Sequence, residues 1–186
     1  MKCTDGKHRC GWVNLNNPKY VKYHDEEWGV PVHDDRKFFE MLVLESFQSG
    51  ISWECILNKR ENFRKAFENF NIEAVSLFDE KKIDELSENP GIVRSRRKIE
   101  ATVRNAGVFK NIQKEWGSFS NYIWSFTDNR VIKETDKISS PLSDRISKDL
   151  KARGMSFVGS VTIYSYLQAT GIIYSHENTC FLNSFM

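Results

Sequence analysis

Apolar residues recur along most of this chain at intervals of three and four, and long alternating runs of apolar and polar residues are absent. This spacing puts the apolar side chains on one face of a helix, whereas a half-buried strand needs a period of two. Asp34 and Asp79 stand where helices would begin, and Gly154 and Gly171 stand where helices would end. We therefore predict an all-α protein, with a turn-rich N-terminal segment and an irregular stretch at residues 127–140.

The predicted helices cover residues 18–24, 34–49, 52–70, 71–77, 79–87, 94–115, 118–126, 142–152 and 159–170. The 186 residues, 40% of them hydrophobic, suffice for one core, so we expect residues 1–186 to form a single domain. No apolar run approaches the roughly 18 residues that a membrane span needs. The N-terminus also lacks the apolar segment of a secretory signal, so we expect a cytoplasmic protein with no membrane partner.

The charges are unevenly distributed, although the net charge is only +2. Residues 94–114 carry seven basic side chains and a single acidic one, Glu100. Residues 25–45, by contrast, are rich in acidic side chains. A basic run of this kind is either a solvated helix face or a phosphate-binding surface, and charge alone leaves both open.

The basic run follows a tight turn at residues 89–93, between two predicted helices. We expect Gly91 to allow a positive φ there, and the next helix to begin with free N–H groups that bind phosphate. This is typical of a helix-hairpin-helix motif, at about residues 79–105, which grips the DNA backbone without reading sequence. An ordinary pair of helices is the alternative. The candidate DNA contacts here are Gly91, Ile92, Arg94, Arg96, Arg97 and Lys98.

Two cysteines and two histidines near the chain ends have the composition of a structural zinc site. Cys10 and His24 lie near the N-terminus, while His176 and Cys180 are four residues apart near the C-terminus. We expect a reducing compartment, which disfavours disulfides, so the segments 10–24 and 176–180 either bind a metal or hold these residues by coincidence. Cys3 and His8 are alternative ligands at the N-terminal end.

Glu45 shares a helix face with the apolar residues that precede it by three and four positions. An ionised carboxylate on such a face is costly unless it is paired, so Glu45 either reaches water at the helix end or awaits a cationic partner. Tyr20, Tyr23 and Trp53 are nearby candidates for aromatic walls. Aromatic walls around one acid suit a flat, cationic ligand that carries an amine.

These features occur together with motifs by which the chain resembles the 3-methyladenine DNA glycosylase I family, over about residues 9–180. The matching segments are RCGWV at 9–13, YHDEEWGVP at 23–31, LE at 44–45, GISW at 50–53, KREN at 59–62, GIVR at 91–94 and FVG at 157–159. Ser46 and Ile51 depart from the family, which usually has glycine and leucine at these positions.

The resemblance implies a helix-hairpin-helix DNA glycosylase fold whose N- and C-termini are joined by a structural zinc site. It implies a monomeric, monofunctional enzyme that flips 3-methyladenine out of alkylated double-stranded DNA and hydrolyses its N-glycosidic bond. Residues 89–93 contain no lysine, which disfavours a Schiff-base lyase and agrees with a monofunctional enzyme. The implied residues are Cys10, His24, His176 and Cys180 as zinc ligands, Glu45 as the catalytic contact to the base, Trp53 as its stacking partner, Tyr20 and Tyr23 as pocket walls, and Gly50 and Ile51 as the group that fills the gap in the duplex.

Two other functions are compatible with parts of this pattern. A zinc-stapled module that binds DNA structure without catalysis would explain the hairpin and the cysteines, and would leave Glu45 unexplained. A zinc hydrolase with Glu45 as general base would need an open coordination position on the metal. The number of protein ligands therefore distinguishes the hydrolase from the other two.

Overall fold

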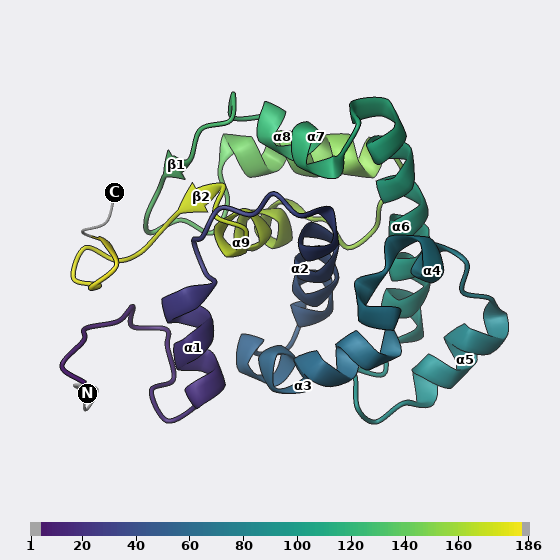
Figure 1. Ribbon diagram of the computed structural model, residues 1–186, viewed down its shortest axis with the longest axis horizontal. Helices are drawn as coiled ribbons and strands as arrows, with labels where there is room; N and C mark the ends of the chain where they lie inside the picture. The colour runs from purple at the N-terminus through teal and green to yellow at the C-terminus, as the bar shows by residue number, and fades with distance from the viewer. Residues whose placement is uncertain (1–4, 184–186) are drawn as a thin grey trace.

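The fold is organised around α2 (Asp35–Gln48), whose residues 38–47 are all buried. This helix begins at Asp34, whose side chain accepts a hydrogen bond from Lys37 N at 2.7 Å. In the computed structural model, which describes residues 5–183, helices pack around α2 on several sides (Figure 1). Its direct neighbours are α3 (Trp53–Ala66), α6 (Arg96–Trp116), α7 (Phe119–Ser125) and α9 (Ser160–Ala169).

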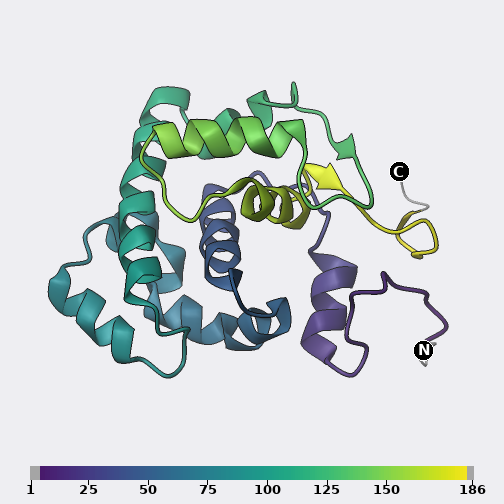
Figure 2. The same cartoon turned by 180° about the vertical axis from the view of Figure 1, so that it is seen from behind.

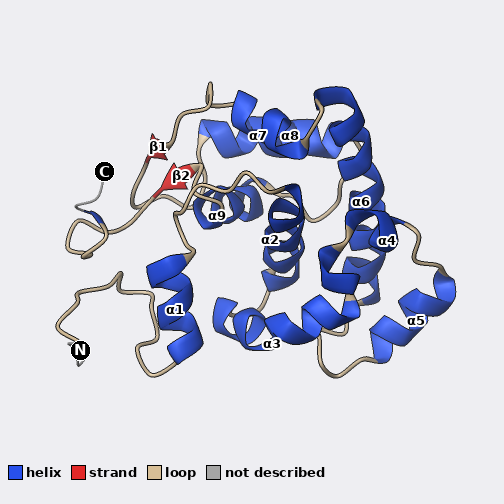
Figure 3. Cartoon of the chain, viewed as in Figure 1, coloured by secondary structure: helices blue, strands red, loops and turns tan. Residues whose placement is uncertain are grey.

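The remaining elements complete an all-α architecture, as predicted, in which two very short strands are the only sheet among the described residues (Figure 3). They are α1 (Pro18–Glu26), the 3-10 helix η1 (Glu68–Phe70), α4 (Ile72–Ser76), α5 (Glu80–Glu88), β1 (Ile132–Lys133), α8 (Pro141–Ala152) and β2 (Ile173–Tyr174). No helix in the described part of the chain is both long and apolar enough to cross a membrane.

The predicted helix at 52–70 ends earlier than expected, at Ala66. Glu68, Asn69 and Phe70 all have positive φ, so the chain turns away from the helix axis before α4 begins. The turn lets Phe67 and Phe70 stack with ring centroids 6.2 Å apart, both inside the core. Burial of two rings in one cluster thus overrides the helical pattern of the sequence.

The irregular stretch predicted at residues 127–140 contains β1, which pairs in parallel with β2. Ile132 N donates to Ile172 O at 2.9 Å, and Glu134 N donates to Tyr174 O at 3.1 Å. Two-residue strands are too short to show a period of two in the sequence, so no pattern could predict them. The pairing brings residues 135–136 beside residues 175–177.

The two ends of the described chain lie on the same side of the molecule, beyond α1 (Figures 1 and 2). Phe181 N donates to His8 O at 2.8 Å, which joins the terminal segments directly. The segment that leads into α1 and the segment that follows β2 therefore meet. This brings together side chains that are more than 150 positions apart in the sequence.

Candidate functional site

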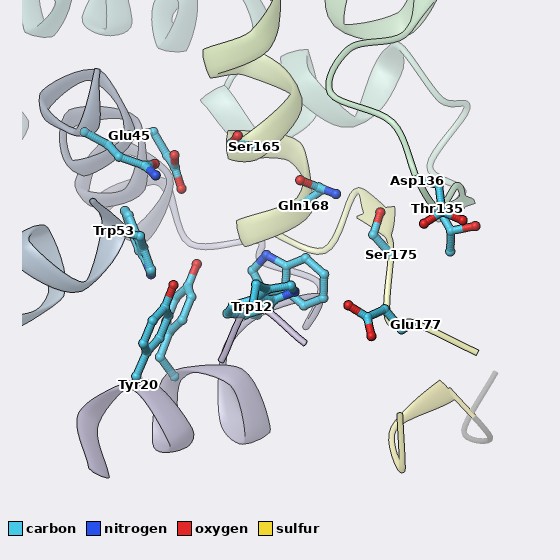
Figure 4. Close-up of a pocket in the computed structure, with 13 residues that line it drawn as sticks. Trp12, Tyr20, Glu45, Trp53, Thr135, Asp136, Ser165, Gln168, Ser175 and Glu177 are labelled. Atoms are coloured by element: carbon cyan, nitrogen blue, oxygen red, sulfur yellow. The ribbon is translucent and has the colours of Figure 1, made fainter. Parts of the chain in front are cut away.

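A pocket of about 350 Å³ opens between α1, the junction of α2 and α3, and α9 (Figure 4). It contains the acid and all three aromatic residues that the sequence singled out. Figure 4 shows Glu45, Trp53 and Tyr20 on one side of it, with Trp12 and Gln168 across from them. The full lining is Trp12, Tyr20, Tyr23, Trp28, Glu45, Gln48, Trp53, Thr135, Asp136, Ser165, Gln168, Ser175 and Glu177.

The Glu45 carboxyl is the one acidic group at the inner end of this pocket, and the side chain is only 5% exposed. Within residues 5–183 it has no hydrogen-bond or ion-pair partner. Burial alone raises the pKa of Glu45 to about 8. A carboxyl in this state is stabilised by any ligand that brings a positive charge or donates hydrogen bonds to it.

Aromatic rings form the walls around this carboxyl. Trp53 and Tyr23 have ring centroids 5.1 Å apart, and Trp12 and Tyr20 have centroids 5.6 Å apart. The indole Nε1 of Trp53 is buried without a hydrogen-bond partner. Burial, with the nearby Glu45 charge, raises the pKa of the Tyr23 phenol well above its ordinary value, so Tyr23 stays neutral. Such walls accept a flat ring by stacking.

Local geometry explains why the acid and the stacking ring meet. Glu45 lies in the last turn of α2, and Trp53 is the first residue of α3. Gly50, at φ +88, turns the chain between the two helices, a conformation that other residues adopt only at a steric cost. Ser52 then caps α3 by accepting a hydrogen bond from Cys55 N at 3.3 Å. A short loop therefore sets the position of both groups.

The outer end of the pocket was missed by the sequence analysis. Gln168 comes from α9, whereas Asp136 and Glu177 are brought there by the pairing of β1 with β2. The Gln168 side chain points into the pocket (Figure 4). No motif marks these residues, because the packing of α9 and a two-residue strand pairing position them.

The four predicted metal ligands form one buried cluster, with ligand atoms all within 4.8 Å of one another. Cys180 Sγ lies 3.5 Å from His176 Nδ1 and 3.6 Å from His24 Nε2, and Cys10 Sγ lies 3.5 Å from His176 Nδ1. Zinc bonds of about 2.3 Å to sulfur and 2.1 Å to nitrogen give tetrahedral edges of about 3.6 Å. The cluster therefore fits a tetrahedral ion. His8 is exposed and outside this cluster, and Cys3 lies outside the described residues.

Both imidazoles are oriented by a second contact. His24 Nδ1 lies 2.8 Å from Asp25 Oδ1, and Asp25 in turn accepts hydrogen bonds from Arg9. His176 Nε2 lies 3.3 Å from the carbonyl oxygen of Trp28. Each ring thus turns its other nitrogen toward the cysteines, as in metal sites whose outer contacts fix the tautomer. The four side chains would fill a tetrahedral shell and leave no open position for hydrolysis.

The predicted hairpin is formed by α5, the turn at residues 89–95, and α6. The expected positive φ at Gly91 is wrong, because this residue is absent from the positive-φ glycines of the described chain. Space there is limited, since an added Cβ would lie 3.0 Å from Asn89 Oδ1 and 3.2 Å from Asn62 Cβ on α3. Lys59 Nζ donates to Pro90 O at 2.8 Å. Lys59, in the KREN segment, therefore holds the turn, and Asn62 of the same segment lies close to Gly91.

The basic residues after the turn have different surroundings. Arg94 and Arg97 are exposed, and neither has an ion-pair partner among residues 5–183. Arg96 forms ion pairs with three carboxylates, those of Glu80, Asp84 and Glu100. The α6 N-cap has no side-chain hydrogen bond, which leaves the first N–H groups of this helix uncapped by a side chain.

The remaining candidates lie closer to the core. Lys98 Nζ donates to the carbonyl oxygens of Phe47 at 2.9 Å and Ser49 at 2.7 Å. Ile92 is buried, so it anchors the turn to the protein. Ile51 is partly buried against the core, next to the exposed Gly50.

Ser46, where the family usually has glycine, donates its hydroxyl to Leu42 O at 2.7 Å and to Phe157 O at 3.2 Å. The hydroxyl is therefore satisfied by backbone carbonyls. It joins the turn of α2 that carries Glu45 to the segment before α9.

The Glu45 pKa predicts a stability that depends on pH. The pKa of Glu45 rises from 4.5 to about 8 on folding. Its contribution to the free energy of unfolding is therefore complete below pH 4.5 and is lost as the pH rises through 8. Across this pH range, we expect the free energy of unfolding of Glu45→Gln to rise by a few kcal/mol relative to that of the unchanged protein. Each tenfold change in proton affinity corresponds to about 1.4 kcal/mol. Denaturant unfolding at several pH values measures it. A difference independent of pH would contradict the unpaired carboxyl.

Comparison with known proteins points to one family. The family model described as methyladenine glycosylase matches residues 12–183. DNA-3-methyladenine glycosylase 1 of Escherichia coli (strain K12) is 40% identical over 178 residues, which cover 92% of this chain and 95% of that protein. DNA-3-methyladenine glycosylase of Haemophilus influenzae is 37% identical and covers 92% of this chain and 96% of that protein.

Solved structures agree with the sequence comparison. A crystal structure of 3-methyladenine DNA glycosylase I has a TM-score of 0.90 and 40% identity, and covers 94% of this chain and 98% of the other. A structure of the Staphylococcus aureus enzyme, which concerns recognition of 3-methyladenine, has a TM-score of 0.87 and 34% identity, and covers 97% of this chain and 95% of the other. The chain therefore belongs to the methyladenine glycosylase family.

Proposed function

We propose that this chain removes 3-methyladenine from alkylated double-stranded DNA by hydrolysing the N-glycosidic bond. The observation that carries the proposal is the buried, unpaired carboxyl of Glu45 among aromatic walls. A pocket of this kind favours a flat cation over a neutral base. The family relatives named above carry this activity in their names. Attached to DNA, 3-methyladenine is such a cation.

The chemistry follows from the charge of the substrate. Methylation at N3 makes adenine cationic, which weakens its glycosidic bond before the enzyme acts. The carboxyl of Glu45 accepts hydrogen bonds from the exocyclic amine and ionises more readily beside the cation. Trp53 stacks on the ring, while Tyr20 and Tyr23 close the walls. Neutral adenine brings no positive charge that would favour ionisation of this buried carboxyl, which gives the selectivity.

The DNA contacts that we propose lie at two places. The uncapped start of α6, with the exposed Arg94 and Arg97, holds the phosphate backbone. Gly50 and Ile51 enter the gap that the flipped base leaves in the duplex. Residues 1–186 act together as a single domain and as a monomer. We place the enzyme in the cytoplasm, a compartment that keeps thiols such as Cys10 and Cys180 reduced.

We assign a structural zinc ion to the cluster of Cys10, His24, His176 and Cys180. Zinc is the divalent ion that such a buried set of two thiols and two imidazoles typically takes. When bound, it staples the two terminal segments and adds its binding free energy to folding. It takes no part in the hydrolysis.

Glu45→Gln is expected to slow release of 3-methyladenine at least about 100-fold, because a neutral amide cannot stabilise the cationic base as a carboxylate does. Purified protein is incubated with methylated duplex DNA, and the released bases are separated by chromatography. Glu68→Gln, at an exposed glutamate of η1, is the matched control. No release by the unchanged protein would refute the proposed function, and equal release by Glu45→Gln would refute the role of Glu45.

Trp53→Ala is expected to weaken binding of free 3-methyladenine by about 1–3 kcal/mol, the usual contribution of one base stacked on one aromatic ring. Titration calorimetry measures it. Trp116→Ala, at a tryptophan that is 39% exposed and lies outside the pocket, is the control. A loss no larger than in that control would argue against stacking on Trp53.

Purified protein is expected to contain about one zinc ion per chain, and Cys180→Ser to lose it. Since one missing ligand breaks the staple between the termini, we expect the melting temperature to fall by about 10 °C. Elemental analysis and thermal unfolding measure the two quantities. Cys55→Ser, at a free cysteine outside the cluster, should keep the ion. A zinc-free native protein, or equal losses in both variants, would contradict the assignment.

A further inference from the structure

The end of α2 depends on a residue from another helix. No basic residue lies in its last turn, although the final carbonyl groups of a helix carry partial negative charge and need donors. Lys98, in the first turn of α6, supplies them. Its ammonium donates to Phe47 O at 2.9 Å and to Ser49 O at 2.7 Å, across about 50 positions of sequence.

The loop at residues 48–52, which we call the wedge loop, starts at these carbonyls. Ile51 N donates to Gln48 O at 2.7 Å, and Gly50 is exposed at φ +88 with no heavy atom within 4 Å of where a Cβ would stand. Gly50, at the tip of the loop, thus has few contacts of its own. Lys98 holds the start of the loop at the carbonyls of Phe47 and Ser49, and the Ser52 cap of α3 holds its end.

Lys98 also belongs to the helix whose start is the proposed phosphate site. Arg97 is its neighbour in sequence, exposed and without an ion-pair partner in the described chain. Lys98 is instead partly buried and engaged by two carbonyls. Arg97 is therefore exposed to solvent, whereas the adjacent Lys98 binds the carbonyls where the wedge loop begins.

We propose that Lys98 is a positioning residue that ties the phosphate-binding end of α6 to the wedge loop, and that it is not itself a phosphate ligand. The inference rests on the proposed function, since it presumes that Gly50 and Ile51 fill the gap in the duplex. Fixing the loop against α6 keeps the wedge at a set distance from the held backbone. A wedge misplaced by about 1 Å loses much of its effect.

The test compares two duplexes, one intact and one with a tetrahydrofuran abasic analogue that leaves a gap for the wedge. Binding of each is measured by fluorescence anisotropy at several salt concentrations. Lys98→Met is expected to lose about fivefold or more of the preference for the gapped duplex, with the salt dependence unchanged. Arg97→Met is expected to weaken binding of both duplexes equally. It is also expected to reduce the slope of log affinity against log salt concentration, which we call the salt slope, by about 0.9.

Three further measurements separate positioning from lost charge or a damaged fold. Lys148→Met, at an exposed lysine of α8, is expected to keep both the preference and the slope. Lys98→Arg, which retains the donors, is expected to recover the preference. Binding of free 3-methyladenine reports that the pocket is folded. If Lys98→Met fails that check, Lys98→Gln, whose amide keeps two N–H donors without the charge, takes its place.

The outcomes distinguish this inference from the proposed function. A preference in Lys98→Met equal to that of the unchanged protein would overturn the inference alone. Lys98→Met could instead weaken binding of both duplexes equally and lower the salt slope. That result would also overturn the inference, because Lys98 would then be a phosphate ligand. If the unchanged protein shows no preference for the gapped duplex, the wedge role of Gly50 and Ile51 fails and the inference fails with it, whereas release of 3-methyladenine tests the proposed function separately.

Discussion

The burial of residues 38–47 of α2 is the constraint on which the rest of the structure depends. Its apolar residues make the centre of the core, so any polar group on the same helix must be paired or pay for its burial. Glu40 is paired: although burial alone raises its pKa, the hydrogen bond and charge of Arg60 hold the pKa of Glu40 below its ordinary value. Glu45 has no such partner, and its carboxyl faces the pocket.

The buried cluster of Cys10, His24, His176 and Cys180 supports the opposite wall of that pocket. The ring of Trp12 contacts His24 edge-on with centroids 5.3 Å apart, and Trp28 contacts His176 in the same manner at 4.7 Å. Two pocket aromatics thus pack directly against two histidines of this cluster. The contacts that join the chain ends therefore also support one wall of the pocket.

Local signals in the sequence were enough to predict most helices, since capping residues and apolar spacing act within a few positions. The same spacing placed Glu45 on a buried face. Features that depend on distant segments could not be predicted. Asn62, which limits the space at Gly91, comes from another helix, and Gln168 joins the pocket through packing of α9. The contacts of Lys98 could not be predicted either, because its carbonyl partners are about 50 positions away.

A direct titration of the Glu45 carboxyl tests the central claim most sharply. Carbon-13 NMR of protein labelled at the glutamate carboxyl carbons, with Glu45→Gln to assign the signal, follows its pKa with and without 3-methyladenine. The free protein is expected to titrate near pH 8, and the bound protein well below that, since the bound base stabilises the ionised carboxylate. Titration of the free protein near 4.5, or a pKa that the base leaves unchanged, would contradict the claim that Glu45 is a buried acid awaiting its substrate.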